Sequence, residues 1–328
     1  MSKSAEEAAE VKKAAQVIQE GGVVAFPTET VYGLGADALN VRAVAKIFEI
    51  KNRPTFDPLI VHIADISDLE KLTKAVPEKA RALMKKFWPG PLTLILPKSR
   101  LVPDLVTSGL STVGIRMPAH PVALSLIREA KSAIAAPSAN PFGALSPTTA
   151  EHVRRQLGSA VETILDGGPC AVGVESTIVE VLGSEVILHR PGGISLEEIQ
   201  AVVGTVRAHG HSKAGEAAVA PGQLESHYAP RARVILFNRP EEIRKAGKMG
   251  VLWFKNNPHV GKFANEEVLS VAGDLKEAAC NLFACLHRLD ALELETIYAE
   301  RVSDPTGLGR AIADRLTRAS KPKGTWNL

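Results

Sequence analysis

Residues 27–35 bring together side chains that could bind a small polar ligand. The segment reads Pro-Thr-Glu-Thr-Val-Tyr-Gly-Leu-Gly and follows a short apolar run that ends at Phe26. Its spacing matches neither a Walker phosphate loop nor the G-x-G-x-x-G fingerprint of dinucleotide sites. The pattern leaves two interpretations open: an ordinary strand-to-helix loop of caps and turns, or part of a binding site.

Two cations follow the helical pattern of residues 41–50. Lys51 and Arg53 belong to the sequence Lys-Asn-Arg-Pro, which stiffens a turn. Arginine offers oxygens a rigid fork and lysine offers a compact charge, so the pair could clamp a triphosphate. The alternative is that both cations complement the helix dipole and stay solvated.

His62 and Arg116 occupy strand-like positions. Alternation places the His62 side chain on the face opposite to Val61 and Ile63, as either a structural histidine or a ligand contact. Arg116 follows the strand-like residues 112–115 and precedes a proline. At such a rim position its guanidinium could receive a carboxylate or form a surface ion pair.

Three more loops combine small and polar residues. Residues 136–141 read Ala-Pro-Ser-Ala-Asn-Pro, which would let a ligand approach backbone N–H groups or would simply turn the chain. Residues 173–177 and 189–193 are polar clusters beside strands, with the same two interpretations. The sequence has no H-x-x-x-H pair on a helix and no G-x-S-x-G elbow, which disfavours a metal site and a serine hydrolase. The remaining loops carry cations and hydroxyl groups that could bind anions, which suggests nucleotide chemistry.

The elements that must position these loops alternate between strands and helices, which predicts an α/β (α+β) fold. The predicted strands are 23–26, 59–63, 92–96, 112–115, 133–135 and 177–182, and the predicted helices are 5–20, 41–50, 77–87, 121–130 and 148–157.

A change of composition indicates a second domain. Residues 206–225 contain hardly any large apolar residue, which is typical of a long linker. Beyond them we predict strands at 234–237, 250–254, 268–271 and 296–299 and helices at 241–246, 275–289 and 308–319. We therefore expect a catalytic domain at 1–205, a linker at 206–230 and a smaller Rossmann-like domain at 231–328.

Bulk properties agree with a two-domain soluble globular protein. The 328 residues exceed the usual range of one domain, and 45% of them are hydrophobic and 23% charged. A net charge of +3 is too small to indicate a nucleic-acid or membrane partner. The 3 cysteines contain no C-x-x-C pair, and the sequence shows neither a signal peptide nor a long apolar run. We expect a reduced, cytoplasmic protein without a membrane partner.

Six short motifs occur in one order along the chain. They are F-P-T-E-T-V-Y-G-L-G (26–35), K-N-R-P (51–54), P-L-I-V-H-I (58–63), W-P-G-P-L-T (88–93), P-S-A-N (137–140) and E-S-T-I (175–178). Each is weak alone, but together they closely resemble the threonylcarbamoyl-AMP synthase family. The resemblance covers residues 10–205, a YrdC-like domain, and continues through H-Y-A-P (227–230) into the C-terminal domain of the longer, two-domain branch.

The resemblance implies an open, twisted sheet around a positively charged cavity. There L-threonine, bicarbonate and ATP would form threonylcarbamoyl-AMP and pyrophosphate, with Mg²⁺ accompanying ATP and no metal bound by the protein itself. By similarity, the threonine-binding positions are Thr30, His62, Arg116, Ala136 and Ser176. The ATP-binding positions are Lys51, Arg53, Asp57, Thr112, Ser138, Ser146, Arg190 and Tyr228, of which we expect Lys51 and Arg53 to be catalytic. A separate tRNA threonylcarbamoyl transferase would consume the product.

The sequence departs from the family pattern at three places. The second residue of K-N-R-P is Asn52 where glycine is common, and Asp57 stands where asparagine is frequent. Asp57 would repel a triphosphate unless it faces the ribose or a metal. Residues 221–226, before the predicted lid residue Tyr228, are unexpectedly polar.

Two rival functions fit parts of the chain. An RNA-binding module would use the basic residues of the last helix, Arg310, Arg315, Arg318, Lys321 and Lys323, which otherwise form a solvated face with at most a weak tRNA contact. A carbamoyltransferase of the hydrogenase-maturation kind shares the YrdC-like domain. That type carries zinc-finger cysteines, which three scattered cysteines do not provide.

Overall fold

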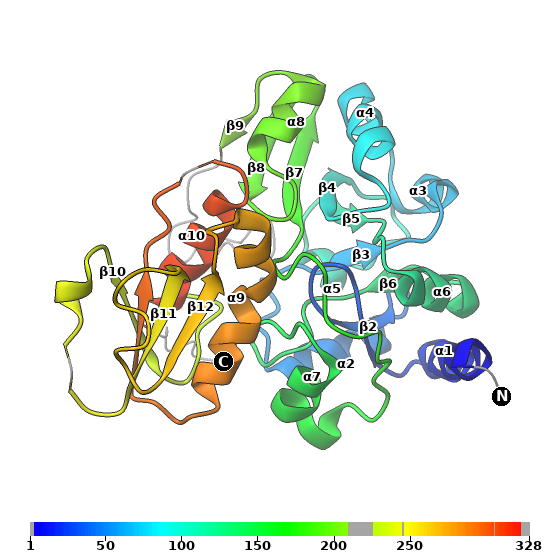
Figure 1. Ribbon diagram of the computed structural model, residues 1–328. Helices are drawn as coiled ribbons and strands as arrows, with labels where there is room; N and C mark the ends of the chain where they lie inside the picture. Colours follow the sequence, from blue (N-terminus) through cyan, green and yellow to red (C-terminus); the bar gives the residue numbers. More distant parts are fainter. Residues whose placement is uncertain (1–2, 209–225, 245, 305, 323–328) are drawn as a thin grey trace.

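The computed structural model describes residues 3–208, 226–244, 246–304 and 306–322, arranged as two lobes (Figure 1). Each lobe is built on its own sheet: a nine-stranded sheet in the N-terminal domain and a four-stranded sheet in the C-terminal domain. Most of the predicted linker, residues 209–225, lies outside the described residues. The exact domain boundaries stay a prediction.

The N-terminal sheet is mixed, with the order β1-β2-β6-β3-β5-β4-β7-β8-β9. Its strands are β1 (Val24–Phe26), β2 (Gly33–Asp37), β3 (Ile60–His62), β4 (Leu92–Pro97), β5 (Thr112–Arg116), β6 (Ile134–Ala135), β7 (Thr177–Leu182), β8 (Glu185–Arg190) and β9 (Arg207–Ala208). The strands β3 and β5 run parallel in the middle, so His62 and Arg116 pair at the same end. The strand β9 extends the sheet into the segment that we predicted to be a linker.

The predicted helices of this domain begin and end close to the predicted residues. The helices of the structure are α1 (Lys3–Gln19), α2 (Val41–Lys51), α3 (Leu69–Leu72), α4 (Glu78–Phe87), α5 (Asp104–Thr107), α6 (Pro121–Ala130), α7 (Ala150–Leu157) and α8 (Leu196–Val203). Of these, the three short helices α3, α5 and α8 were not predicted. Asn40 caps the start of α2, because its side chain accepts hydrogen bonds from two backbone N–H groups. Asn52 caps the end of α2 and has a left-handed φ of 52°. Glycine or asparagine suits that conformation, which explains the departure in K-N-R-P.

The segment 27–35 is not a strand-to-helix loop. Gly33 and Gly35 lie in β2, which pairs antiparallel with β1, so residues 27–32 connect a hairpin. A Cβ atom on Gly35 would lie 2.6 Å from Ile134 Cγ2 and 2.7 Å from the Phe26 ring. Gly35 therefore makes room for neighbouring side chains in the sheet, and not for a ligand.

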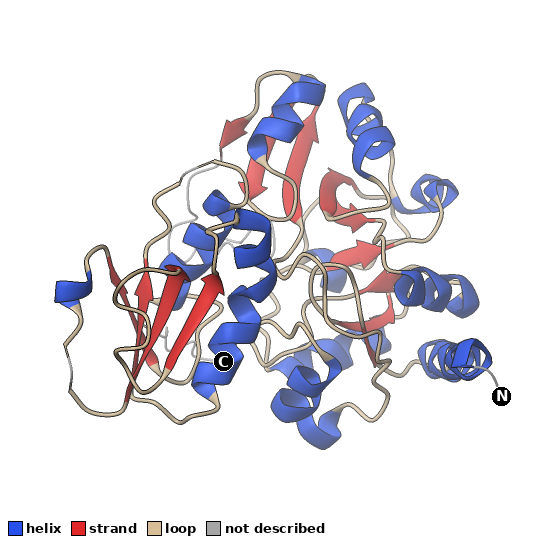
Figure 2. Ribbon diagram, in the orientation of Figure 1, coloured by secondary structure: helices blue, strands red, loops and turns tan. Residues whose placement is uncertain are grey.

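The C-terminal domain has a parallel sheet in the order β10-β13-β11-β12. Its strands are β10 (Arg233–Phe237), β11 (Met249–Lys255), β12 (Glu266–Ser270) and β13 (Thr296–Glu300), and its helices are α9 (Leu275–Asp290) and α10 (Gly309–Ala319). Both helices cover the sheet face that turns toward the N-terminal domain, while loops cover the other face (Figure 2). The described part of this domain is thus two-layered.

One predicted helix of this domain is wrong. Residues 241–246 were expected to be helical, but the described part contains only a 3₁₀ turn at Pro240–Glu242. The described residues 243, 244 and 246 are not helical, and Gly247 has a φ of 65°, which turns the chain toward β11.

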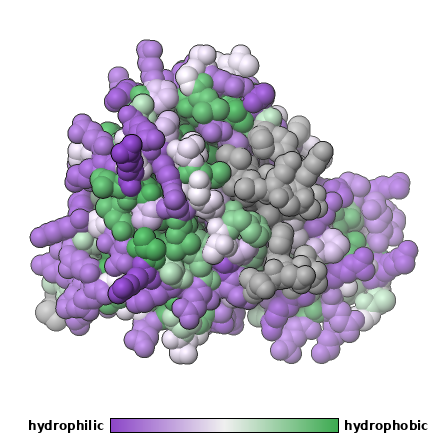
Figure 3. Space-filling view, turned by 180° about the vertical axis from the view of Figure 1, so that it is seen from behind, coloured by the Kyte–Doolittle hydropathy of each residue, from purple (hydrophilic) through white to green (hydrophobic). Residues whose placement is uncertain are grey.

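The two domains share one apolar cluster. Val31, Leu145 and Val174 of the N-terminal domain pack with the inner residues of α9 and α10. At Gly173 the chain approaches α9 so closely that a Cβ atom would lie 2.4 Å from the Cys280 backbone. Seen from behind, apolar residues gather over the N-terminal lobe, beside the boundary between the lobes (Figure 3). The interface is therefore packed like a core, which fixes the C-terminal domain against the site described next.

Candidate functional site

Most of the predicted site residues meet in one cavity at the end of β3 and β5. The cavity encloses about 50 Å³ in this structure. Its lining comprises Thr28, Thr30, Val31, Gly33, Arg53, Ile60, His62, Arg116, Ala136, Pro137, Ser138, Glu175, Ser176, Arg190, His227 and Tyr228. Pockets for small ligands usually span roughly 300–1,000 Å³, so a nucleotide would have to enlarge this one.

One end of the cavity is organised by Arg116. Its Nη1 donates a hydrogen bond of 2.9 Å to the Thr30 hydroxyl, and its Nη2 lies 2.7 Å from a carboxylate oxygen of Glu29. The Thr30 hydroxyl also lies 2.8 Å from the Thr28 hydroxyl. The Arg116 side chain is only 4% exposed, so its charge must be balanced, and Glu29 does this. The motif residues 28–30 thus meet a buried guanidinium.

His62 forms the side of this end. Its ring packs edge-on against Phe26 at 6.0 Å between ring centroids, and its Nδ1 lies 3.2 Å from the Ile60 carbonyl oxygen. Burial, aided by the charge of Arg116, lowers its pKa to about 3. His62 therefore lines the cavity as a neutral ring near pH 7. It can exchange hydrogen bonds there without adding charge.

Lys51 lies behind the cavity wall and does not line it. Its ammonium donates to the carbonyl oxygens of Ser138 and Asn140, with a distance of 2.6 Å to Ser138. Burial and the nearby Arg53 lower its pKa well below the ordinary value. Lys51 accordingly fixes the P-S-A-N loop, and that loop presents Ser138 to the cavity.

Arg53 does line the cavity, and Asp57 accounts for its position. The two side chains form an ion pair of 2.9 Å, and Arg53 also donates to the carbonyl oxygens of Asp57 and Pro58. Asp57 is fully buried, and burial raises its pKa although Arg53 lowers it. Asp57 therefore faces the arginine rather than the cavity, which removes the predicted repulsion of a triphosphate.

The E-S-T-I motif and Arg190 form the opposite wall. Arg190 donates to the Ser176 carbonyl oxygen at 3.0 Å and to its hydroxyl at 3.2 Å. Glu175 lines the cavity and accepts a hydrogen bond from Ser146, which lies behind it. Burial alone would raise the pKa of Glu175, but Arg315, Arg190 and Ser146 outweigh it and hold this pKa below its usual value. Glu175 is thus a carboxylate within a positive wall.

The segment 227–228 covers the cavity. Tyr228 is buried and has a left-handed φ of 64°. The His227 ring packs edge-on against Phe142 at 5.6 Å between ring centroids. These residues close the cavity at this end, which agrees with the lid position that the resemblance implies for Tyr228. Residues 221–225, whose polarity was unexpected, lie outside the described residues.

The structure separates the predicted residues into two groups. Thr30, Arg53, His62, Arg116, Ala136, Ser138, Ser176, Arg190 and Tyr228 line the cavity. Lys51, Asp57 and Ser146 lie directly behind the wall, as described above. Thr112 is remote, because it begins β5 while Arg116 ends it, and it lines a separate small cavity with Thr93 and Thr107.

Sequence reasoning did not assign a role to Glu29, Glu175 or His227. All three lie inside the quoted motifs, and a titratable side chain within such a motif was the signal that sequence reasoning could have used. The contact of Arg315 with Glu175 had no such signal, because the two are 140 positions apart.

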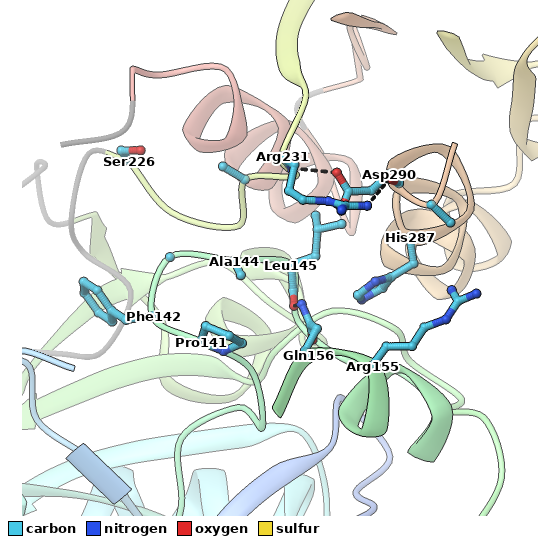
Figure 4. A pocket seen from close by; sticks show the side chains of 13 residues that line it. Pro141, Phe142, Ala144, Leu145, Arg155, Gln156, Ser226, Arg231, His287 and Asp290 are labelled. Carbon is cyan, nitrogen blue, oxygen red and sulfur yellow. Dashed lines mark hydrogen bonds and ion pairs between the residues drawn. The ribbon is translucent and has the colours of Figure 1, made fainter. Parts of the chain in front are cut away.

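A larger cavity lies between the domains and contains none of the predicted residues. It encloses about 650 Å³ beside the loop 141–145 and is bordered by Arg155, Arg231, His287 and Asp290 (Figure 4). Arg231 is ion-paired with Asp290 at 3.3 Å. The arginines of this cavity are fewer than those of the smaller cavity, and none of them belongs to the quoted motifs. We assign the chemistry to the smaller cavity, which collects Arg53, Arg116 and Arg190.

Within the described ranges, no three histidine, cysteine or carboxylate side chains are grouped to hold a metal ion. No helix in the same part of the chain is long and apolar enough to cross a membrane.

Comparisons with known proteins agree with this architecture. A family model described as "Telomere recombination" (Sua5/yciO/yrdC) matches residues 16–192, and the "Threonylcarbamoyl-AMP synthase, C-terminal domain" model matches residues 194–321. The sheet, the cavity and these two models define a two-domain enzyme with a YrdC-like domain.

Individual relatives are similar over nearly the whole chain. Threonylcarbamoyl-AMP synthases from Pyrococcus abyssi and Bacillus subtilis are 46% and 47% identical, covering 94% and 95% of this chain and 94% and 93% of their own. The crystal structure of P. abyssi Sua5 complexed with L-threonine matches with a TM-score of 0.87 and 45% identity over 94% of both chains. The chain belongs to the threonylcarbamoyl-AMP synthase family.

The hydrogenase-maturation alternative rests on fold alone. Full-length HypF is 21% identical with a TM-score of 0.51, and the match covers 56% of this chain and 29% of that protein.

Proposed function

We propose that the protein synthesises L-threonylcarbamoyl-AMP from L-threonine, bicarbonate or CO₂, and ATP, with release of pyrophosphate, and is thus a nucleotidyltransferase. The observation that best supports this proposal is that one cavity joins an end formed by Thr30 and Arg116 to a wall formed by Arg53 and Arg190. The product is the first intermediate of threonylcarbamoyladenosine (t⁶A) formation in tRNA, at the adenosine beside the anticodon. The P. abyssi structure contains L-threonine, and we transfer that ligand to this chain as part of the proposal.

L-Threonine would bind at the Arg116 end. Its carboxylate matches a guanidinium, and its hydroxyl matches the small polar groups of Thr30, Ser176 and the neutral His62 ring. Because Nη2 of Arg116 already contacts Glu29, the substrate carboxylate would have to share or displace that carboxylate. Ala136 leaves space beside the backbone. A site that pairs with the hydroxyl rejects an analogue without it, because its own polar groups would be left unpaired.

Two bonds form in the proposed reaction. The threonine nitrogen attacks the carbon of CO₂ and loses a proton, which gives a carbamate; starting from bicarbonate, the C–OH bond also breaks and a water molecule leaves. A carbamate oxygen then attacks the α-phosphorus of ATP as the bond to pyrophosphate breaks. No protein nucleophile is needed, and the protein contributes alignment and positive charge.

The ATP phosphates would lie along Arg53, Arg190 and Ser138. Lys51 would act on them through the backbone of residues 138–140, which it holds, and Arg53 would contact them directly. Tyr228 would close over the nucleotide after the cavity enlarges. We retain Thr112 as a predicted ATP contact, although it lies outside this cavity.

Mg²⁺ would enter with ATP. Asp57 and Glu175, the acidic residues nearest the phosphates, are paired with Arg53 and Arg315, so neither is free to become a metal ligand. Magnesium ions commonly keep several waters and bind through substrate phosphates, which suits a site of this composition. The metal would neutralise charge on the phosphates.

The product would pass to a separate tRNA threonylcarbamoyl transferase in the cytoplasm. A weak, salt-sensitive contact with tRNA stays part of the proposal, but its predicted surface needs correction. Arg315 and Arg318 of α10 are buried and ion-paired, and therefore do not form a solvated basic face. Lys323 lies outside the described residues.

The decisive experiment incubates pure protein with labelled bicarbonate and ATP. We expect a labelled adenylate with threonine, pyrophosphate in equal amount, and much less product with serine. If no threonine-dependent adenylate forms, the proposed function is wrong.

A further inference from the structure

The C-terminal domain sends one charged side chain into the wall of the cavity. Arg315 of α10 is fully buried, and its Nε donates a hydrogen bond of 2.7 Å to Glu175. Its Nη1 donates to the Pro191 carbonyl oxygen at 3.0 Å. Glu175 directly precedes Ser176, and Pro191 directly follows Arg190. One guanidinium from α10 therefore connects both segments of the opposite wall.

The same guanidinium supports the lid. Its central carbon lies 4.9 Å from the centroid of the Tyr228 ring, which is the geometry of a cation–π contact. Tyr228 lines the cavity on its other side. Arg315 thus connects the carboxylate of the wall with the ring that covers it, although it does not itself line the cavity.

The charges around Arg315 balance. Asp314 pairs with both Arg315 at 2.6 Å and Arg318 at 2.9 Å, while Glu175 pairs with Arg315. Two arginines and two carboxylates therefore make a neutral cluster next to the proposed phosphate site. Without Arg315 the cluster would carry one net negative charge, with Glu175 buried at the cavity surface.

We propose that Arg315 is a positioning residue for ATP: it neutralises Glu175 and holds Tyr228, so that the C-terminal domain completes the phosphate end of the cavity. This inference rests on the proposed function, in that ATP is the ligand. A triphosphate entering the cavity meets a paired carboxylate, whose repulsion is cancelled by a charge supplied from the other domain.

The test compares Arg315→Met and Arg315→Lys with Arg310→Met. Arg310 is a matched control, because it lies on the same helix and also forms an interdomain ion pair, with Glu197 at 3.0 Å, but at the exposed edge. We expect Arg315→Met to raise KM for ATP about 100-fold, the scale of an uncompensated buried charge. KM for threonine should change little, while the melting temperature should fall, because Glu175 loses the partner of a buried ion pair. The KM for ATP of Arg315→Lys should lie between those of Arg315→Met and the wild type. The KM for ATP of Arg310→Met should match that of the wild type.

A double variant separates charge compensation from simple support of the fold. Glu175→Gln removes the unpaired charge, so Arg315→Met/Glu175→Gln should recover about tenfold in KM for ATP over Arg315→Met. The ratio of KM for ATP between Arg315→Met and wild type should also shrink as pH falls, because without Arg315 the burial of Glu175 raises its pKa and favours the protonated form; this dependence should vanish in the double variant. Equal KM values for Arg315→Met and Arg310→Met, or a loss that neither pH nor Glu175→Gln relieves, would overturn the proposal.

Calorimetric titration with ATP keeps this result separate from the proposed function. If the wild type binds ATP without forming a threonine-dependent adenylate, the proposed reaction fails, while the ATP affinities of the variants still test Arg315.

Discussion

The two ends of the cavity take their charged side chains, and the residues that hold them in place, from different parts of the chain. At the threonine end, Arg116, Glu29 and Thr30 all come from the N-terminal domain and contact one another directly. At the phosphate end, Arg53 and Arg190 meet Tyr228 from the connecting segment, with Arg315 of the C-terminal domain behind it. The threonine end is thus preorganised by one domain, whereas the phosphate end depends on domain docking. We expect conditions that loosen the interface to weaken ATP binding before threonine binding.

The largest effect should come from breaking the phosphate end. We expect Arg53→Ala to lower the rate about 10²–10³-fold, the scale for losing one preorganised electrostatic donor. The measurement is pyrophosphate release that depends on threonine, bicarbonate and ATP. Arg42→Ala is the control, because Arg42 lies on α2, the helix that directly precedes Arg53, and is exposed. Unchanged turnover would remove Arg53 from the mechanism.

Breaking the threonine end should affect the other substrate. Arg116→Met removes the group that we expect to bind the threonine carboxylate, so KM for threonine should rise about 10- to 100-fold, the range for hydrogen bonds to charged groups. ATP affinity, measured by titration in the absence of threonine, should stay near the wild-type value. Arg154→Met, at an exposed ion pair of 4.0 Å, should leave both unchanged. A parallel loss of ATP affinity would contradict the division into two ends.

The sheet behind the threonine end can be disturbed without changing charge. Gly35→Ala places a methyl group 2.6 Å from Ile134 Cγ2, and such overpacking costs about 1–3 kcal/mol of unfolding free energy. Gly114→Ala is matched, because it also lies in this sheet but its methyl group would be 3.4 Å from the nearest atom, Thr93 Cγ2. Urea unfolding measures both. Equal stabilities would show that β2 moves aside more easily than the packing implies.

The docked interface should be sensitive to acid through His287. This ring stacks on His152 at 3.8 Å and contacts the Ser146 carbonyl oxygen, and burial lowers its pKa to about 4. Between pH 6.5 and 4 the unfolded chain binds a proton at His287 that the folded chain does not. Stability should therefore be complete above pH 6.5 and fall with decreasing pH, by at most about 1.4 kcal/mol per pH unit from this residue.

His287→Gln can retain an N–H donor for Ser146 but cannot titrate. Urea unfolding at pH 7, 6 and 5 should give a smaller decrease of stability for this variant than for the wild type. An identical decrease in both proteins would assign the acid sensitivity to other groups.

The motif residues and their strands were predictable because local patterns encode them. The apolar runs predicted β1, β3, β4 and β7, and alternation correctly placed His62 on the face opposite to its neighbours. Gly33 and Gly35 lie in β2 but were assigned to a loop, because β2 has no run of large apolar side chains to reveal it. The helix predicted at 241–246 was wrong in the opposite sense: the pattern there indicated a helix, but the described part forms only a 3₁₀ turn at Pro240–Glu242.

The sequence by itself thus determined the family, the two-domain α/β plan and most of the residues that line the cavity, because these depend on local pattern and on motifs. Only the tertiary structure decided that Lys51 supports a loop from behind, that Asp57 faces Arg53, and that Arg315 is buried against Glu175. Those outcomes depend on which opposite charges are buried as pairs when the chain folds. Arg315 and Glu175 are 140 positions apart, so no local pattern predicts their contact.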